Sequence, residues 1–307
     1  MDSQEPHKEF SLRKKLVFSA LSMVCFLIVF EMALQVAGIF VKRIKKPGIR
    51  PGTKAIVCIG DSHTFGMYLK KEQAYPAQLE KLLNQGGGNY QVFNMGAPGQ
   101  NSTQMLNSLP RIIREYKPIV LVLLAGVNNG WNISGQEKSL SQEVLNKFKL
   151  YRLFRFFYYQ KVKGRKFPSM SMRRDDYEFL FHDDRGTVPV NDSELRAVQR
   201  LYISDLVKII ELCRENGVTV VMMTYAGDKN FNYATINGLI RQVAAKMDVP
   251  LVDNYAYFMK ILYLPDGTRR DDLIPKLFLK TMHPSEEGYR LIANNLYQVL
   301  KQQAIIP

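Results

Sequence analysis

Short apolar runs alternate with amphipathic stretches over most of this 307-residue chain. Apolar runs bounded by Gly, Pro or Asn predict buried strands at residues 55–59, 90–94, 119–124, 218–226 and 250–253. Apolar residues at helical spacing predict helices at 75–85, 103–116, 194–216, 231–247 and 286–301, and Pro110 is expected to bend or divide the second helix. Strands separated by helices predict an α/β fold: a three-layer α/β/α domain with a five-stranded parallel sheet, covering about 54–128 and 194–305.

A longer apolar segment, residues 16–41, precedes this domain and is interrupted near one end by Glu31 and Gln35. A helix needs about 20 residues to cross a membrane, so we interpret the segment as a single transmembrane anchor. The alternatives are a cleavable signal peptide and a buried helix of a soluble protein. No small-residue cleavage site follows the apolar core, and basic clusters on both sides fit a membrane span better. The predicted organisation is therefore a polar basic tail at 1–15, the anchor at 16–41, a linker at 42–53, and a domain at 54–307 with an insert at 131–193.

Charge adds a preference for anionic surfaces. The chain has 42 Lys and Arg against 28 Asp and Glu, a formal net charge of +14, which suits either nucleic acid or an anionic membrane. Basic residues around the anchor slightly favour a cytoplasmic position for the domain. Cys25, Cys58 and Cys213 lie in apolar surroundings without zinc-site spacing, so we expect neither a disulfide framework nor a metal or other cofactor.

The insert contains a segment, residues 147–167, in which basic and aromatic residues are interleaved. Such a pattern is typical of an amphipathic segment that lies on anionic lipid or covers an active site. It also fits a helix that packs its aromatic residues on the core, or a platform for single-stranded nucleic acid. Because the chain carries a membrane anchor, we favour the lipid or covering role and expect no nucleic-acid partner.

Candidate chemistry gathers where predicted strands end. The first strand ends in Gly60-Asp61-Ser62, which places the Ser62 hydroxyl at the edge where open α/β sheets bind ligands. A serine nucleophile needs a base, and His283 stands just before the last predicted helix, for which Ser285 is the expected N-cap. Acyl transfer also needs donors for the developing oxyanion, and in this fold the backbone N–H groups of Ser62 and Gly96 and the side chain of Asn128 would supply them.

These residues resemble the SGNH/GDSL hydrolase superfamily. The resemblance is based on the motifs IGDSHTFG, NMGAPGQNS, LLAGVNN and HPSEEGY, which appear in the family's order. The stretch YPAQLE also resembles bacterial members with an N-terminal anchor. The resemblance covers about 54–305 and implies a flavodoxin-like hydrolase fold, with Ser62 as nucleophile, Gly96 and Asn128 as oxyanion donors, and His283 as general base. Anchored members usually place this domain outside the cytoplasm, in contrast to the charge count.

Two positions depart from the family's pattern. Lys280 stands where the family usually has an acid, three residues before the histidine, and Asn129 stands where it usually has Asp. The acid orients the histidine and stabilises its charged form. The candidates for this role are Asp271, Asp272 and Asp266; alternatively, a backbone carbonyl holds the ring in a Ser–His dyad.

Other polar residues near the motifs have structural interpretations. Asp61 is expected to brace its turn by bonding local backbone, and His63 to point away from the nucleophile or to line the pocket. His182, in the insert, is expected at the surface, and His7 belongs to the tail.

The leading functional hypothesis is a membrane-anchored serine esterase that acts on an O-acyl ester of an envelope carbohydrate or lipid. An O-acyltransferase would use the same site, with a membrane acyltransferase as a candidate partner. A binding or assembly protein with impaired catalysis is the alternative from another class, favoured by Lys280 and Asn129. For a single-pass protein of the cell membrane, the resemblance implies an extracytoplasmic, periplasmic domain.

Overall fold

The computed structural model describes residues 11–44, 48–85, 87–129, 148–151, 192–231 and 233–306, together with positions 145 and 154. The chain divides into two compact units, one of residues 1–47 and 137–169 and the other of 48–136 and 170–307. Most of the insert 131–193 lies outside the described residues, and so do His7 and His182. The predictions for these parts therefore stay predictions.

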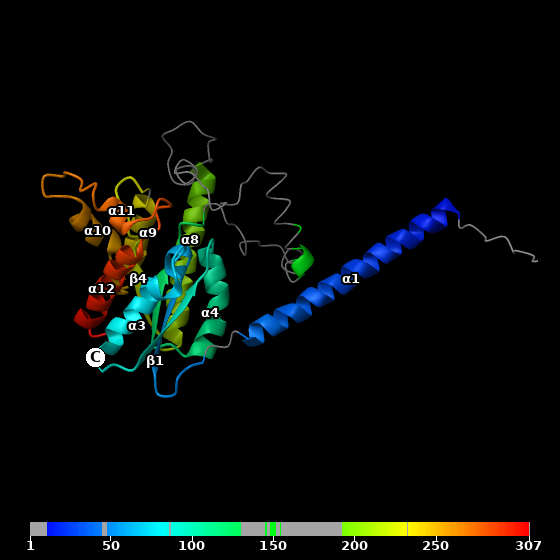
Figure 1. Cartoon of the computed structure of the whole chain (residues 1–307), viewed down its shortest axis with the longest axis horizontal. Helices are drawn as coiled ribbons and strands as arrows, with labels where there is room; N and C mark the ends of the chain where they lie inside the picture. Colours follow the sequence, from blue (N-terminus) through cyan, green and yellow to red (C-terminus); the bar gives the residue numbers. More distant parts are fainter. Residues whose placement is uncertain are drawn as a thin grey trace, which may run out of the picture. The chain divides into compact units, whose positions relative to one another are not determined.

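The first unit is built on α1 (Leu12–Ile44), the long helix drawn in blue in Figure 1. Within α1, Leu12–Ala37 is long and apolar enough to cross a membrane. Large apolar side chains along it are exposed, Phe18 at 75%. The Glu31 carboxylate accepts hydrogen bonds from the backbone N–H groups of Lys149 and Leu150 at 2.9 and 2.8 Å. The start of the basic-aromatic segment thus contacts a polar position of the apolar helix.

The second unit contains the predicted five-stranded parallel sheet, with strand order β2-β1-β3-β4-β5. The strands are β1 (Lys54–Gly60), β2 (Tyr90–Gly96), β3 (Val120–Leu124), β4 (Thr219–Met223) and β5 (Leu251–Val252). Every residue of β3, and every residue of β1 after Lys54, is buried, as expected for apolar runs covered on both faces. Because β1 pairs with both β2 and β3, the chain reverses its direction across the sheet beside β1, where open α/β sheets bind ligands.

Helices cover the sheet in two layers, which confirms the α/β/α architecture. The main ones are α3 (Tyr75–Gln85), α4 (Ser102–Tyr116), α8 (Asp192–Glu215), α9 (Ala234–Lys246) and α12 (Glu286–Gln302). α3 packs against α12, whereas α4 packs against α8 and α8 against α9. This division follows from right-handed crossovers, which put the helix after β1 and the helix after β2 on opposite faces. Of the two effects expected of Pro110, division of the helix is excluded, because α4 is a single helix with Pro110 inside it.

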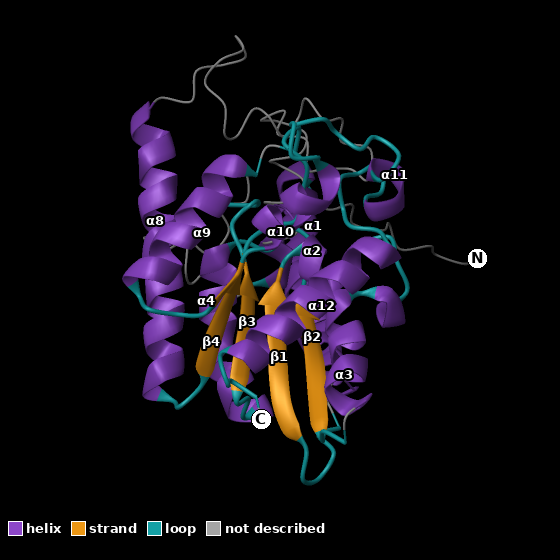
Figure 2. Cartoon of the chain, turned by 90° about the vertical axis from the view of Figure 1, so that its left-hand side faces the viewer, coloured by secondary structure: helices purple, strands orange, loops and turns teal. Residues whose placement is uncertain are grey.

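Short elements that the apolar pattern did not predict lie between the main ones. They are α2 (Ser62–Phe65), the 3₁₀ turn η1 (Lys71–Gln73), α10 (Asn254–Leu262) and α11 (Ile274–Leu277). Figure 2 shows that α2, α10 and α11 gather beyond the arrowheads of the strands. The carboxyl edge of the sheet is therefore the end of this unit at which the short helices cluster.

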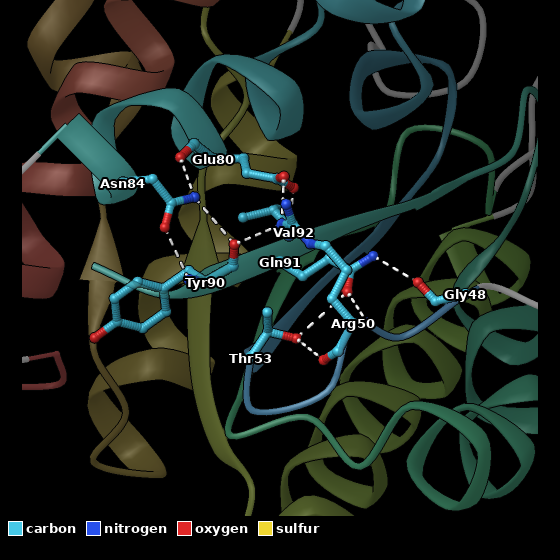
Figure 3. Close-up of polar contacts among 8 residues, drawn as sticks. All are labelled: Gly48, Arg50, Thr53, Glu80, Asn84, Tyr90, Gln91 and Val92. Atoms are coloured by element: carbon cyan, nitrogen blue, oxygen red, sulfur yellow. Dashed lines mark hydrogen bonds and ion pairs between the residues drawn. The ribbon is translucent and has the colours of Figure 1, made fainter. Parts of the chain in front are cut away.

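The segment before β1, which includes Arg50, forms hydrogen bonds along the edge strand β2 (Figure 3). The Arg50 backbone N–H donates to Gln91 Oε1 at 2.9 Å, and its guanidinium donates to Glu80 Oε1 at 3.0 Å and to the Tyr90 carbonyl at 3.1 Å. The other oxygen of Glu80 accepts the Val92 N–H at 2.7 Å. These contacts satisfy backbone groups of an edge strand that would otherwise be open to pairing with another chain.

Candidate active site

The structure places Ser62 at the carboxyl end of β1, as the first residue of α2. The turn between them is braced by Asp61, the N-cap of α2, whose side chain accepts the His63 backbone N–H at 2.9 Å. This contact confirms the bracing role expected for Asp61. The backbone N–H of Ser62 has no hydrogen-bond partner within the described part of the chain, as expected at the start of a helix. Ser62 thus combines a half-buried hydroxyl with an unused backbone donor.

His283 reaches Ser62 from the loop before α12, where Ser285 is the N-cap as predicted. His283 Nε2 lies 2.9 Å from Ser62 Oγ, and Nδ1 lies 3.0 Å from the Thr281 backbone carbonyl. A carbonyl oxygen only accepts hydrogen bonds, so Nδ1 carries the proton and Nε2 is left to accept the Ser62 hydroxyl proton. Burial lowers the pKa of His283 from its ordinary 6.5, partly offset by the Thr281 carbonyl. The ring is therefore in the neutral form that a general base requires.

The candidate acids lie elsewhere, and of the two expected ways of orienting His283 the structure shows the backbone carbonyl. Asp271 is 78% exposed and pairs with Arg269 at 3.0 Å. Asp272 pairs with Lys276 at 3.3 Å, and Asp266 accepts the Thr268 backbone N–H. Each lies in the exposed loop before α11, where a local partner holds it. Among the described residues, the group that orients His283 Nδ1 is the Thr281 carbonyl, with the Thr281 hydroxyl at 3.3 Å.

Gly96 has a structural role that the sequence did not indicate, and its role as oxyanion donor stays a prediction. Its backbone N–H donates to Asn94 Oδ1 at 3.0 Å, so this donor is already engaged. The need for glycine comes instead from packing, because a Cβ at this position would lie 2.3 Å from the Phe65 backbone nitrogen. Gly96 thus lets β2 approach the short helix that carries Ser62.

Asn128 is buried behind the end of β3, and its side-chain amide donates to the Gln100 carbonyl at 3.0 Å. Gln100 closes a turn after β2 by donating its backbone N–H to the Ala97 carbonyl at 3.1 Å. Within this turn Gly99 has φ of +77°, a left-handed conformation that glycine adopts without strain. The turn thereby presents the Gln100 carbonyl to the Asn128 amide. The Pro98-Gly99 dipeptide, a strong turn signal, could have indicated this glycine from the sequence.

Asn129 is explained by a buried network that sequence reasoning missed. Its side chain accepts the Ser102 backbone N–H at 3.1 Å and donates to Ser102 Oγ at 2.6 Å. The hydroxyls of Ser102 and Thr103 both donate to Asp205 Oδ2 at 2.6 Å. An aspartate at 129 could not donate to Ser102 Oγ and would add a second carboxylate to this buried cluster. With its acid on α8, this network needs an amide at 129, which accounts for the departure from the family's pattern.

A second buried carboxylate lies directly under the nucleophile. Asp61 accepts the Tyr225 hydroxyl at 2.6 Å, and burial raises the pKa of Asp61 to about 6. Tyr225 follows β4, so its contact with Asp61 joins two strand ends that are far apart in the sequence. His63, on the other side of Ser62, is buried with its ring stacked on that of His283. It does not point away from the site, and so of the two expected placements the one beside the catalytic groups is observed.

Comparisons with known proteins find similar sequences and similar structures among esterases. Esterase TesA of Pseudomonas aeruginosa is 32% identical over 77 residues, a match that covers 25% of this chain and spans 38% of the length of that esterase. Among solved structures, the psychrotrophic esterase EstA from a Pseudoalteromonas species is similar with a TM-score of 0.50 at 13% identity, covering 82% of this chain and 98% of that one. A structure of TesA is similar with a TM-score of 0.46 at 18% identity, covering 81% of this chain and 99% of that one.

The likeness to EstA concerns the fold alone. The sequence profile of one family reaches further, because it matches residues 58–291 and so includes the ends of β1, β2 and β3 and the loop that carries His283. The chain therefore belongs to the GDSL-like lipase/acylhydrolase family, and its site is consistent with that of a serine esterase.

Proposed function

We propose that this protein is a serine ester hydrolase in which Ser62 is the nucleophile and His283 the general base. The observation that carries the proposal is the 2.9 Å contact between Ser62 Oγ and His283 Nε2, with Nδ1 of the same ring held by the Thr281 carbonyl. A hydroxyl at hydrogen-bond distance from a neutral, oriented imidazole is the arrangement that serine acyl transfer requires.

In the first step, Ser62 Oγ attacks the ester carbonyl carbon while its proton passes to His283 Nε2. The carbonyl electrons move to the oxygen, and the resulting oxyanion is bound by the Ser62 backbone N–H and the Asn128 side-chain amide. The third expected donor is the backbone N–H of Gly96, which is bonded to Asn94 in this structure and would exchange that partner for the oxyanion. Fixed donors of this kind typically contribute about 10²–10³ each to the rate.

The tetrahedral intermediate then collapses to an acyl-Ser62 ester, and the alkoxide leaves with the proton held by His283. Water repeats the sequence: His283 takes its proton, the new hydroxyl attacks the acyl carbon, and Ser62 leaves with the proton. Throughout, the Thr281 carbonyl keeps Nδ1 protonated. A carbonyl stabilises the transient imidazolium less than a carboxylate would, so we expect slower turnover than a triad with an acid supports.

The same site can transfer the acyl group if a sugar hydroxyl takes the place of water, and this O-acyltransferase activity is the alternative. We propose as natural substrate an O-acyl ester of an envelope carbohydrate or lipid, with a membrane acyltransferase as candidate partner in the transfer case. Support comes from the family and from α1, whose exposed apolar side chains need a nonpolar surrounding.

We further propose that α1 anchors the protein as a single span and that the domain lies on the extracytoplasmic, periplasmic side. Protease treatment of membrane vesicles of known sidedness tests this orientation. Digestion of the domain in right-side-out vesicles is the expected result, and digestion in inside-out vesicles alone would contradict it.

The enzymatic proposal is tested with the full-length protein in mild detergent, by hydrolysis of nitrophenyl esters of short and medium acyl chains. Wild type, Ser62→Ala and His283→Ala are compared, each checked for folding by circular dichroism. We expect both variants to lose about 10³-fold or more in kcat. Addition of a sugar acceptor that diverts product from free acid to sugar ester would favour transfer. A folded wild type without Ser62-dependent turnover would refute the enzyme and favour the binding or assembly protein.

A further inference from the structure

A second histidine ring, that of His63, lies against the ring of the general base His283. The rings of His63 and His283 are stacked with centroids 4.6 Å apart and planes inclined by 24°. Both side chains are buried, with His63 5% and His283 7% exposed. His63 directly follows the nucleophile in the sequence, so the α2 turn that presents Ser62 also sets the position of this second ring.

His63 is held firmly by its surroundings. Its Nε2 lies 3.2 Å from the Tyr233 hydroxyl, and its backbone N–H donates to Asp61. The rings of Tyr225 and Tyr233 meet it edge-on, at centroid distances of 5.2 and 5.7 Å. A ring fixed from several elements is a rigid surface against which another ring can be placed.

His283, in contrast, is held by few contacts from other elements of the fold. Its Nδ1 is held by a carbonyl of its own loop, two residues away, instead of by a carboxylate on a separate element. On its outer side it meets the edge of Tyr68, a ring that is 45% exposed, at 5.5 Å. The loop also contains Met282 with φ of +62°, a conformation that non-glycine residues rarely adopt. The stacked ring of His63 is therefore the contact of His283 that is itself held by other elements of the fold.

The charge state of His63 fits such a role. Burial, followed by the proximity of His283, holds the pKa of His63 well below its ordinary value. His63 thus stays neutral, and the pair carries a single positive charge when His283 becomes an imidazolium. A neutral aromatic ring can stack on that cation without repelling it, and aromatic faces attract cations.

We propose that His63 is a positioning residue for the base: its ring supports the flat face of His283 and, together with the Thr281 carbonyl, does the orienting that a carboxylate would otherwise do. This inference rests on the proposed esterase function, since it assigns a role within the same site. The proposal explains how His283 can act as base without an acid partner among the described residues, because its ring is fixed by stacking on His63 as well as by the hydrogen bond to Thr281.

The test uses full-length protein in detergent and compares His63→Leu with His63→Phe. Leu keeps much of the volume but removes the ring, whereas Phe keeps a flat ring and loses the bond to Tyr233. We expect His63→Leu to lower kcat by about tenfold with KM within about twofold of wild type, because misplacing the base affects only the chemical step. We expect His63→Phe to retain at least about half of the wild-type kcat.

Three outcomes would overturn the proposal. If the turnover of the wild type depends on Ser62 but His63→Leu has an unchanged kcat, the positioning role of His63 is refuted and the proposed esterase function stands. An equal loss of kcat in folded His63→Leu and His63→Phe shows that ring stacking is not the cause. A wild type without Ser62-dependent turnover overturns the proposed function and this role with it. Should His63→Leu fail to fold, His63→Gln, which keeps a hydrogen-bonding group but removes the ring, is expected to lower kcat about tenfold with unchanged KM, and an unchanged kcat there would also refute the proposal.

Discussion

The buried carboxylate under the nucleophile leads to a prediction about stability and pH. Asp61 is fully buried and accepts the Tyr225 hydroxyl and the His63 backbone N–H. Burial is the largest influence on it and raises its pKa from 3.8 to about 6, although both hydrogen bonds act in the opposite direction. The substitution Asp61→Asn keeps the shape of the side chain and its ability to cap α2 but removes the titration.

The sign of the effect follows from the raised pKa. Between pH 3.8 and about 6 the folded protein keeps a proton on Asp61 that the unfolded chain has released. The stability contributed by protonated Asp61 is thus fully present below pH 3.8 and is lost as the pH rises through about 6. At about 1.4 kcal/mol for each pKa unit, the loss is about 1 kcal/mol at pH ~4.5 and about 3 kcal/mol at pH ~7.5. Asparagine loses nothing over this range.

We therefore expect the difference in free energy of unfolding between Asp61→Asn and wild type to shift by about 2 kcal/mol in favour of the variant from pH ~4.5 to pH ~7.5. Urea unfolding of the full-length proteins in detergent, followed by circular dichroism at both pH values, measures this difference. His63 and His283 titrate in both proteins, so their contributions cancel to first order. Asp272→Asn, at an exposed carboxylate, is the control and is not expected to reproduce the shift. A difference that is the same at both pH values would refute the reasoning.

Three further predictions concern the loop of the base and the network behind Asn129. Lys280→Ala should keep kcat/KM within about twofold, because Lys280 is exposed and His283 Nδ1 bonds to Thr281; a change beyond about tenfold would place Lys280 at the site. Asp205→Ala should lower the free energy of unfolding by about 2–4 kcal/mol in urea titrations, since it leaves two buried hydroxyls without their acceptor; a loss below about 0.5 kcal/mol would contradict this. The pH profile of kcat/KM should rise with a midpoint below 6.5, because burial lowers the pKa of His283; a midpoint near 7 or above would argue against His283 as the group that must be deprotonated.

Periodicity predicted the sheet well because each strand is a simple local pattern. The apolar runs correspond to β1 to β5 in the expected order, and the main helices lie within a few residues of their predicted ends. The short helices α2, α10 and α11 were missed because four to nine residues carry too little periodicity to stand out from a loop. Pro110 was expected to bend or divide its helix, and it does not divide it, because α4 continues through this position.

The site shows the same division between local and distant information. Ser62 and His283 were identified because each lies in a recognisable motif, and the structure brings them within 2.9 Å. The partner of His283 Nδ1 was not identified, because a backbone carbonyl leaves no trace in residue identity. Asp205 and Tyr225 were missed for another reason: they reach the site from α8 and from the end of β4, which the motifs do not include. The packing role of Gly96 was missed because a glycine alone does not reveal whether packing or a donor requires it.

The central claim is that Ser62 is the acylated nucleophile, and the most direct measurement is the site of a covalent adduct. Full-length protein in detergent is treated with a fluorophosphonate probe, and the adduct is located by intact-mass and peptide mass spectrometry in wild type, Ser62→Ala and His283→Ala. The account predicts one adduct on Ser62 in wild type, none in Ser62→Ala, and labelling slowed by about 10²-fold or more in His283→Ala. A folded wild type that remains unlabelled, or an adduct on another residue that persists in Ser62→Ala, would contradict it.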